Sequence, residues 1–113
     1  MCGIIGFIGG DFTNDQLSNA ILEEMSDQLV KRGPDSSGIW LDSLSKVALG
    51  HRRLAIVDLS PAGYQPMTSS SNRYVMTYNG EIYNCHEIRN ELIKSRVTVI
   101  GEDILIPKYF WLV

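Results

Sequence analysis

The sequence is poor in cysteine and lacks an excess of positive charge, and these two shortages exclude several classes of protein. Its two cysteines, Cys2 and Cys85, are too few for the disulfide framework of a small secreted domain, and they form no CxxC motif for zinc or redox chemistry. The formal net charge of -3 and the isoelectric point near 5.2 indicate no basic patch for nucleic acid or an anionic membrane. We therefore expect two free thiols, and neither nucleic acid nor membrane as a partner.

Long apolar runs are also missing. A short apolar cluster in 4–8 is broken by glycine and has no basic residues before it, so it is not typical of a signal peptide. The mostly apolar end, 104–113, is shorter than the roughly 18 residues that a membrane-spanning helix needs. With 113 residues, of which 44% are hydrophobic and 20% charged, the chain has the composition of one globular domain, and we expect it in the cytoplasm.

Local patterns predict a chain of mixed α and β structure. The β-branched and aromatic residues in 2–8 predict a strand, which a glycine pair ends. A capping box from Thr13 to Gln16 predicts a helix that ends at Lys31–Arg32. Strand residues in 39–41 and 47–49 predict a hairpin, and a second capping pattern predicts a shorter helix over 84–95. The apolar side chains expected on one face of the first helix are Leu17, Ala20, Ile21, Leu22, Met25 and Leu29.

The pair Asn79-Gly80 lies between two segments with strand chemistry, 74–78 and 81–83. Asn-Gly is the strongest short signal for a type I′ turn, because both residues tolerate the backbone angles that this turn requires. On local grounds alone the pair therefore predicts a β-hairpin.

Cys2 directly follows the initiator methionine, so removal of Met1 would place a thiol and a free α-amine on one residue. The amine can then accept the thiol proton at neutral pH, directly or through one water, which gives a nucleophile that carries its own base. The alternative is that Cys2 is a small, buried apolar residue at the start of a strand. The rest of the chain has to decide between the two.

Three further features have an ordinary structural interpretation. The turn formers in 32–38 predict a loop between helix and strand, and Arg52 is expected on a solvated face. The two histidines, His51 and His86, have no partner at metal-ligand spacing. We interpret them as structural or exposed residues and expect no metal site.

Several groups of residues, taken together and in this order, nevertheless resemble a known family. They are Cys2-Gly3-Ile4, Arg32-Gly33-Pro34-Asp35 with Ser37-Gly38, the run from His51 to Asp58, Gln65-Pro66, and the run from Asn79 to Asn84. The combination resembles the glutaminase domain of class II glutamine amidotransferases, in the asparagine synthetase (glutamine-hydrolysing) branch. The resemblance covers residues 2–84 and favours a functional interpretation of Cys2 and Asn79-Gly80 over the structural ones.

The resemblance implies hydrolysis of L-glutamine to glutamate and ammonia. Cys2 would be the nucleophile, with its α-amine as the base and then as the acid that protonates ammonia. The side-chain amide of Asn79 and the backbone N–H of Gly80 would form the oxyanion hole. The other matched residues would bind the substrate: Arg53 its carboxylate, with backbone groups of Leu54, Ala55, Ile56 and Val57 beside it, and Glu81 with a later aspartate its ammonium.

That aspartate is expected at Asp103, in a segment that departs from the family pattern. The family has a Ser-Asp-Thr-Glu-like motif that opens a helix, whereas Gly101-Glu102-Asp103-Ile104-Leu105 stands here at the corresponding distance. The chain continues as the apolar stretch 104–113, in which Pro107 disfavours helix just before it. We expect a strand-prone tail.

By resemblance the fold class is α+β, the N-terminal nucleophile hydrolase αββα sandwich, and we expect only its first half in 1–113. The synthetase domain that follows in the family, with its ATP and Mg, is expected to be absent. No cofactor is therefore expected here, and the ammonia acceptor, aspartate or another carboxylate, stays open. A half sandwich would leave a sheet face or edge uncovered.

Two other functions remain as alternatives. The chain can be a non-catalytic truncated fragment or pseudo-domain that acts only through a partner chain, which the irregular tail favours. A thiol-based redox or metal protein is the weaker alternative, because the residues it would use, Cys2, His51, Cys85 and His86, lack ligand spacing.

Overall fold

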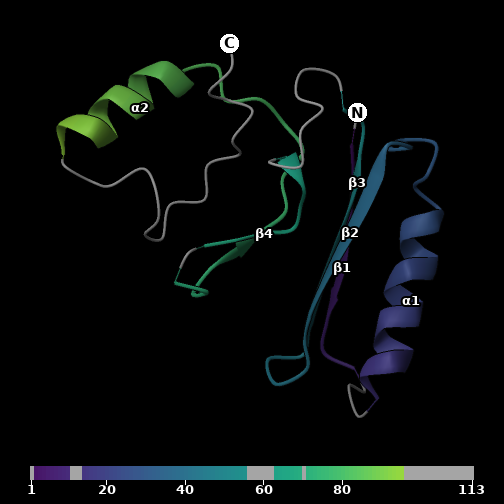
Figure 1. Ribbon diagram of the computed structural model, residues 1–113. Coiled ribbons are helices and arrows are strands. Elements are labelled where there is room, and N and C mark those ends of the chain that lie inside the picture. Colours follow the sequence, from purple (N-terminus) through teal and green to yellow (C-terminus); the bar gives the residue numbers. More distant parts are fainter. Residues whose placement is uncertain (1, 11–13, 56–62, 70, 96–113) are drawn as a thin grey trace.

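The computed structural model describes residues 2–10, 14–55, 63–69 and 71–95 and has mixed α and β structure (Figure 1). Thr13, Ile56, Val57, Asp103 and the tail 104–113 lie outside the described residues. The elements in chain order are β1 (Gly3–Ile8), α1 (Asp15–Asp27), β2 (Ser36–Asp42), β3 (Val47–Arg53), β4 (Met67–Thr68), β5 (Val75–Met76) and α2 (Cys85–Lys94).

The first three strands form an antiparallel sheet in the order β1-β3-β2. The expected hairpin is confirmed, because β2 pairs with β3 from Asp42 opposite Val47 to Ser36 opposite Arg53. The expected N-terminal strand is also confirmed, and it pairs with the other edge of β3, with Gly3 opposite Arg52. The central strand β3 therefore runs beside the N-terminus of the chain.

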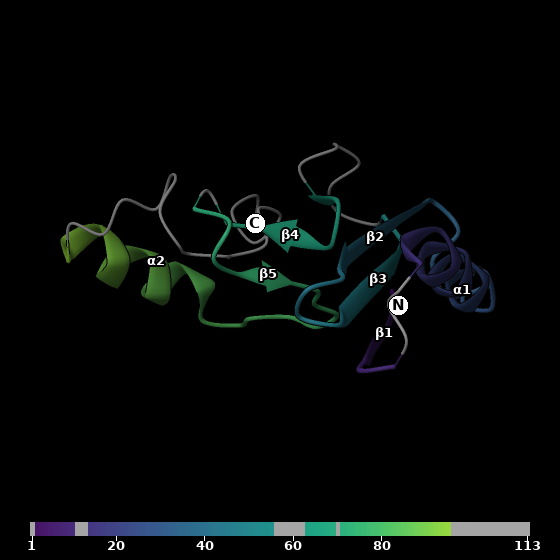
Figure 2. The same cartoon turned by 90° about the horizontal axis from the view of Figure 1, so that it is seen from below.

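Side chains of β3 alternate between the two faces of this sheet. Ala48 faces α1 and forms the buried core of the described residues with Leu22, while partly buried Ile5, Phe7 and Leu41 pack around them. Arg52, on the same face, lies 3.8 Å from the carboxylate of Asp27, and its side chain is only 11% exposed, so the expected solvated position is wrong. His51 and Arg53 consequently point to the opposite face, on the side where β4 and β5 lie (Figures 1 and 2).

Helix α1 begins one residue later and ends earlier than the sequence predicts. Its N-cap is Asn14, whose side chain accepts hydrogen bonds from the backbone N–H groups of Gln16 and Leu17 at 2.9 and 3.2 Å. Beyond Asp27 the backbone hydrogen bonds contract to three-residue spacing, with Leu29 N–H to Ser26 O at 2.9 Å, so the chain leaves the helix in turns.

The buried face of α1 also differs from the expected one. Its buried residues are Ser18, Leu22 and Ser26, whereas Leu17 and Ile21 are 58% and 43% exposed. Small serine side chains allow the helix to approach the sheet closely along this line, and only one large side chain is buried there. The prediction was right about Leu22 and wrong about Leu17 and Ile21.

The hairpin expected at Asn79-Gly80 is not formed. Strand β5 pairs with the preceding β4, with Met67 opposite Met76, and the described residues 81–83 are not in a strand. Neither Asn79 nor Gly80 is among the described residues with positive φ, which a type I′ turn would require at both positions.

Helix α2 lies within the predicted range, with Asn84 and Ser95 at its ends, but the Asn84 side chain makes no capping hydrogen bond and no residue of the helix is buried. In Figure 1 it stands apart from the three-stranded sheet. Over the described ranges, neither helix has the length and apolar character needed to cross a membrane.

Candidate functional site

The end of β3 lies beside the thiol of Cys2. Because β1 and β3 are antiparallel and Gly3 lies opposite Arg52, the residue before β1 meets the residues that follow β3. The Cys2 sulfur accepts a hydrogen bond from Leu54 N–H at 3.4 Å and donates to Leu54 O at 3.8 Å. The half-buried thiol is thus held next to one of the backbone segments that the sequence assigns to the substrate.

The Asn79 side chain reaches the same residue from the second half of the chain. Its Nδ2 donates to the carbonyl oxygen of Cys2 at 3.0 Å. A carboxamide nitrogen has two N–H donors, and this bond uses one of them. Gly80 follows directly and is exposed. The structure therefore brings together Cys2, Leu54 and Asn79, which the sequence predicted as members of one site.

Asp35, to which the sequence assigned no role at the site, supports this arrangement. Its backbone N–H donates to Arg53 O at 3.0 Å, and its carboxylate accepts from Ala55 N–H at 2.6 Å. Two residues earlier, a Cβ on Gly33 would lie 2.5 Å from Arg52 O, so only glycine permits this approach of the two backbones. The loop over 32–35 thus holds the end of β3. The sequence signal for this role was the position of Asp35 in one of the motifs that resemble the family.

Arg53 lies on the sheet face opposite α1 and is only 5% exposed. Its guanidinium carbon is 5.8 Å from the ring centroid of Tyr64, within the range of a cation–π contact. Glu81 is exposed, and no hydrogen bond or ion pair joins it to the other site residues over the described ranges. The remaining predicted members, Ile56, Val57 and Asp103, lie outside these ranges.

His51 is a buried residue on the same face as Arg53, with 1% of its surface exposed. Burial lowers the pKa of its imidazole; a hydrogen bond to the Tyr78 backbone opposes this effect, and the charge of Arg53 adds to it. His86 is exposed, and no group of metal-ligating side chains occurs within the described part of the chain.

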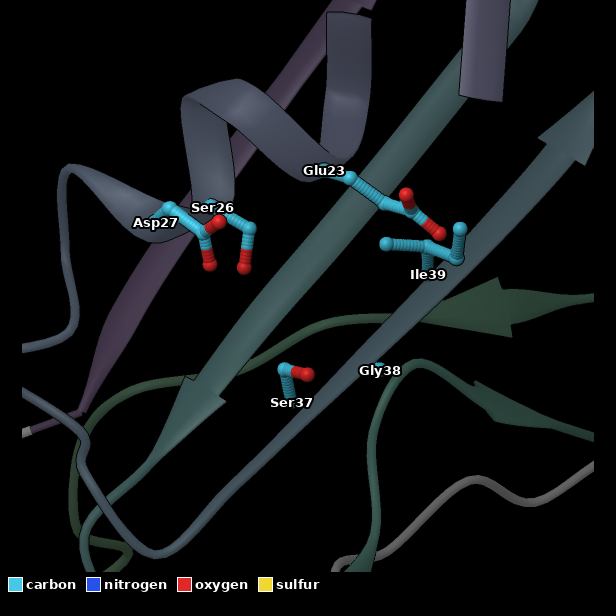
Figure 3. Close-up of a pocket in the computed structure, with 6 residues that line it drawn as sticks. All are labelled: Glu23, Ser26, Asp27, Ser37, Gly38 and Ile39. Carbon is cyan, nitrogen blue, oxygen red and sulfur yellow. The ribbon is translucent and has the colours of Figure 1, made fainter. Parts of the chain in front are cut away.

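A separate hollow of about 330 Å³ lies between α1 and β2 (Figure 3). Glu23, Ser26 and Asp27 line it from the helix, and Ser37, Gly38 and Ile39 line it from the strand. None of the predicted site residues lines it, so this hollow and the candidate site are different places.

The sequence is similar to known proteins of one family. The sequence model of the family described as glutamine amidotransferase domain matches residues 1–103. Asparagine synthetase [glutamine-hydrolyzing] 3 of Bacillus subtilis is 42% identical over 95 residues, which cover 81% of this chain and 15% of the relative. Asparagine synthetase [glutamine-hydrolyzing] 2 of Arabidopsis thaliana is 40% identical over 103 residues, which cover 91% of this chain and 17% of the relative.

A relative with a different name is Amidase chry2 of Gibberella zeae, which is 36% identical over 100 residues, covering 81% of this chain and 15% of the relative. In each of these comparisons the matching part spans less than a fifth of the relative.

Proposed function

Since the chain belongs to the glutamine amidotransferase domain family, in the asparagine synthetase branch of class II, we propose that it hydrolyses L-glutamine to glutamate and ammonia. The observation that carries the proposal is the meeting of three groups at Cys2: the Leu54 backbone contacts its thiol, and the Asn79 side-chain amide contacts its carbonyl oxygen. Acyl transfer from an amide requires a nucleophile with hydrogen-bond donors for the developing oxyanion close by, and the second N–H of an Asn79 amide held at Cys2 is suited to be one of them.

The reaction would proceed through a thioester on Cys2. The sulfur attacks the side-chain carbonyl carbon of glutamine, and the α-amine of the same residue takes the thiol proton. The negative charge that develops on the carbonyl oxygen is stabilised by the second N–H of the Asn79 amide and by the N–H of Gly80. The α-amine then protonates the departing ammonia, and water hydrolyses the thioester. This sequence requires removal of Met1, because otherwise the amine of Cys2 is part of a peptide bond.

The two charged groups at the other end of glutamine would select the substrate. Arg53 is suited to the carboxylate because its planar guanidinium donates two parallel hydrogen bonds. Backbone groups of 54–57 would lie beside it, and Glu81 with Asp103 would bind the ammonium. The burial of Arg53 supports this role, since a desolvated cation interacts strongly with an incoming carboxylate.

The N-terminal nucleophile αββα sandwich is the fold that we propose for the domain. The sheet with α1 on one face and β4–β5 on the side of the other supplies elements compatible with its first layers. We further propose that the glutaminase step needs no cofactor, that ATP and Mg belong to a synthetase domain, and that the protein acts in the cytoplasm.

Replacement of the nucleophile tests the proposal. The chain, with Met1 removal verified by intact mass, is assayed for glutamate release beside Cys2→Ala and the control Cys85→Ala, which removes the other free thiol. We expect turnover in the wild type and the control and only background in Cys2→Ala. Equal turnover in the wild type and Cys2→Ala would rule out the catalytic role.

A second candidate is a non-catalytic domain that acts through a partner chain. The observation in its favour is that β1, α1 and α2 each carry an exposed apolar side chain, with Ile8 at 83%, Leu17 at 58% and Ile93 at 55%. Sedimentation analysis separates the candidates: this one predicts self-association or an unfolded chain and no Cys2-dependent turnover, whereas a folded, active monomer contradicts it.

A further inference from the structure

Gln65 was singled out in the sequence as part of a motif without a role, and the structure shows what its side chain does. It is 4% exposed, and its Oε1 accepts a hydrogen bond from the backbone N–H of Tyr78 at 2.5 Å. Its own backbone carbonyl lies against Gly38 of β2 so closely that a Cβ on Gly38 would overlap with it. Gln65 therefore connects the edge strand of the sheet to the residue that precedes Asn79.

His51 holds the same residue from the centre of the sheet. Its imidazole forms a hydrogen bond to the Tyr78 backbone, and this bond favours the protonated ring. Only a hydrogen-bond acceptor stabilises the protonated imidazole, so the group of Tyr78 in this bond is its carbonyl oxygen. Because Nε2 has no hydrogen-bond partner over the described ranges, the donor is Nδ1. Such a bond requires a proton on Nδ1.

Both polar groups of the Tyr78 backbone are thus bound by buried side chains, one from the loop before β4 and one from β3. The next residue, Asn79, has an exposed side chain that reaches the Cys2 carbonyl. A short exposed segment would otherwise place its donors loosely, and a catalytic donor has to be held within about 0.5 Å of its productive position.

We propose that Gln65 and His51 are positioning residues, which fix the Tyr78 backbone and thereby hold the Asn79 amide at Cys2. This inference rests on the proposed glutaminase function. Neither residue touches the substrate; each acts through the backbone of one residue. Their loss is expected to lower kcat and to leave the KM for glutamine nearly unchanged, because Arg53 and the end of β3 are held by other contacts.

The test uses the full chain with Met1 removed and measures kcat and KM for glutamine. Gln65→Leu keeps the size of the side chain without the acceptor, and Gln65→Glu keeps an acceptor at the same length. We expect kcat to fall about 10- to 100-fold in Gln65→Leu, as for a misplacement of roughly 1 Å, and to recover in Gln65→Glu. In the Asn79→Ala background, Gln65→Leu should cause no further loss, because the group it positions is gone.

His51 provides an independent pair. His51→Asn places an amide N–H where Nδ1 is, whereas His51→Gln places it near Nε2, so we expect kcat at least about 10-fold higher in the former. If Gln65→Leu does not fold, the comparison of kcat between these two His51 variants tests the positioning role by itself.

The outcomes separate this inference from the proposed function. Equal turnover in the wild type and Cys2→Ala removes the glutaminase and the inference with it. A Cys2-dependent wild type with unchanged kcat in Gln65→Leu, an additive loss in the Asn79→Ala background, or equal kcat in the two His51 variants overturns the positioning role alone.

Discussion

The side-chain amide of Asn79 donates a hydrogen bond of 3.0 Å to the carbonyl oxygen of Cys2, although 77 positions separate the two residues. The bond ties the segment after β5 to the N-terminus of the chain, next to the thiol. It also orients the carboxamide, because a primary amide held by one N–H keeps the other at a defined angle. This bond and the contacts around it determine what substitutions at the site should do.

Loss of the Asn79 amide should reduce chemistry more than binding. For Asn79→Ala we expect kcat to fall about 10²- to 10³-fold, as is typical when one oxyanion-hole donor is removed, with little change in KM. Asn84→Ala is the matched control, since the Asn84 side chain makes no capping hydrogen bond at the start of α2. Steady-state glutamate release measures both, and a similar kcat in the two variants would argue against the oxyanion role.

Arg53 and its neighbour Arg52 offer a test of substrate binding. Arg53→Lys keeps the charge and loses the planar pair of donors, so we expect KM for glutamine to rise about 10-fold, the loss of roughly one good hydrogen bond. Arg52→Lys changes the same residue type on the opposite face, where the partner Asp27 is mostly exposed, and should leave KM unchanged. The same KM in both variants would count against Arg53 as the residue that binds the carboxylate of glutamine.

Asp35 should contribute to stability through the end of β3. Asp35→Ala removes the acceptor of Ala55 N–H, and we expect the free energy of unfolding to fall by about 1 kcal/mol. Asp27→Ala removes a mostly exposed carboxylate at 3.8 Å from Arg52, near the limit of an ion pair, and should cost less than Asp35→Ala. Urea unfolding of both variants checks this, and equal costs would show that the loop over 32–35 does not support β3.

The buried imidazole of His51 predicts a specific pH dependence of stability. Burial lowers its pKa below the ordinary value of 6.5, against the hydrogen bond to the Tyr78 backbone and with a smaller contribution from Arg53. The unfolded chain therefore takes up a proton at a pH where the folded chain does not. The contribution of this lowered pKa to stability is complete at pH values above the pKa of His51 in the unfolded chain. It is lost as the pH falls through the pKa of His51 in the folded chain.

The corresponding measurement compares urea midpoints at about pH 7.5 and about pH 5.5. We expect the midpoint to fall less in His51→Asn than in the wild type, and to fall as in the wild type in His86→Asn, at an exposed position. An unchanged pH dependence in His51→Asn would contradict the prediction.

Local structure was largely predictable, because it depends on neighbours in the chain. The strand at the N-terminus, the β2–β3 hairpin and the position of α2 follow from residue type and spacing. The predictions failed where the structure of a segment depends on which distant part of the chain packs or pairs with it. The face of α1 with Leu17 and Ile21 is the more apolar one, but the sheet packs against Ser18 and Ser26. Asn79-Gly80 has hairpin chemistry, but β5 pairs with β4 instead.

The sequence by itself determined the family and the chemical groups of the candidate site: a thiol behind the initiator methionine, a guanidinium at the end of a strand and a carboxamide before a glycine. Only the tertiary structure decided which of these groups meet, and which others support them. Asp35 at Ala55, Gln65 at Tyr78 and Asn79 at Cys2 are contacts between residues far apart in the chain. Such contacts depend on how the strands and loops pack, which residue type and local spacing do not encode.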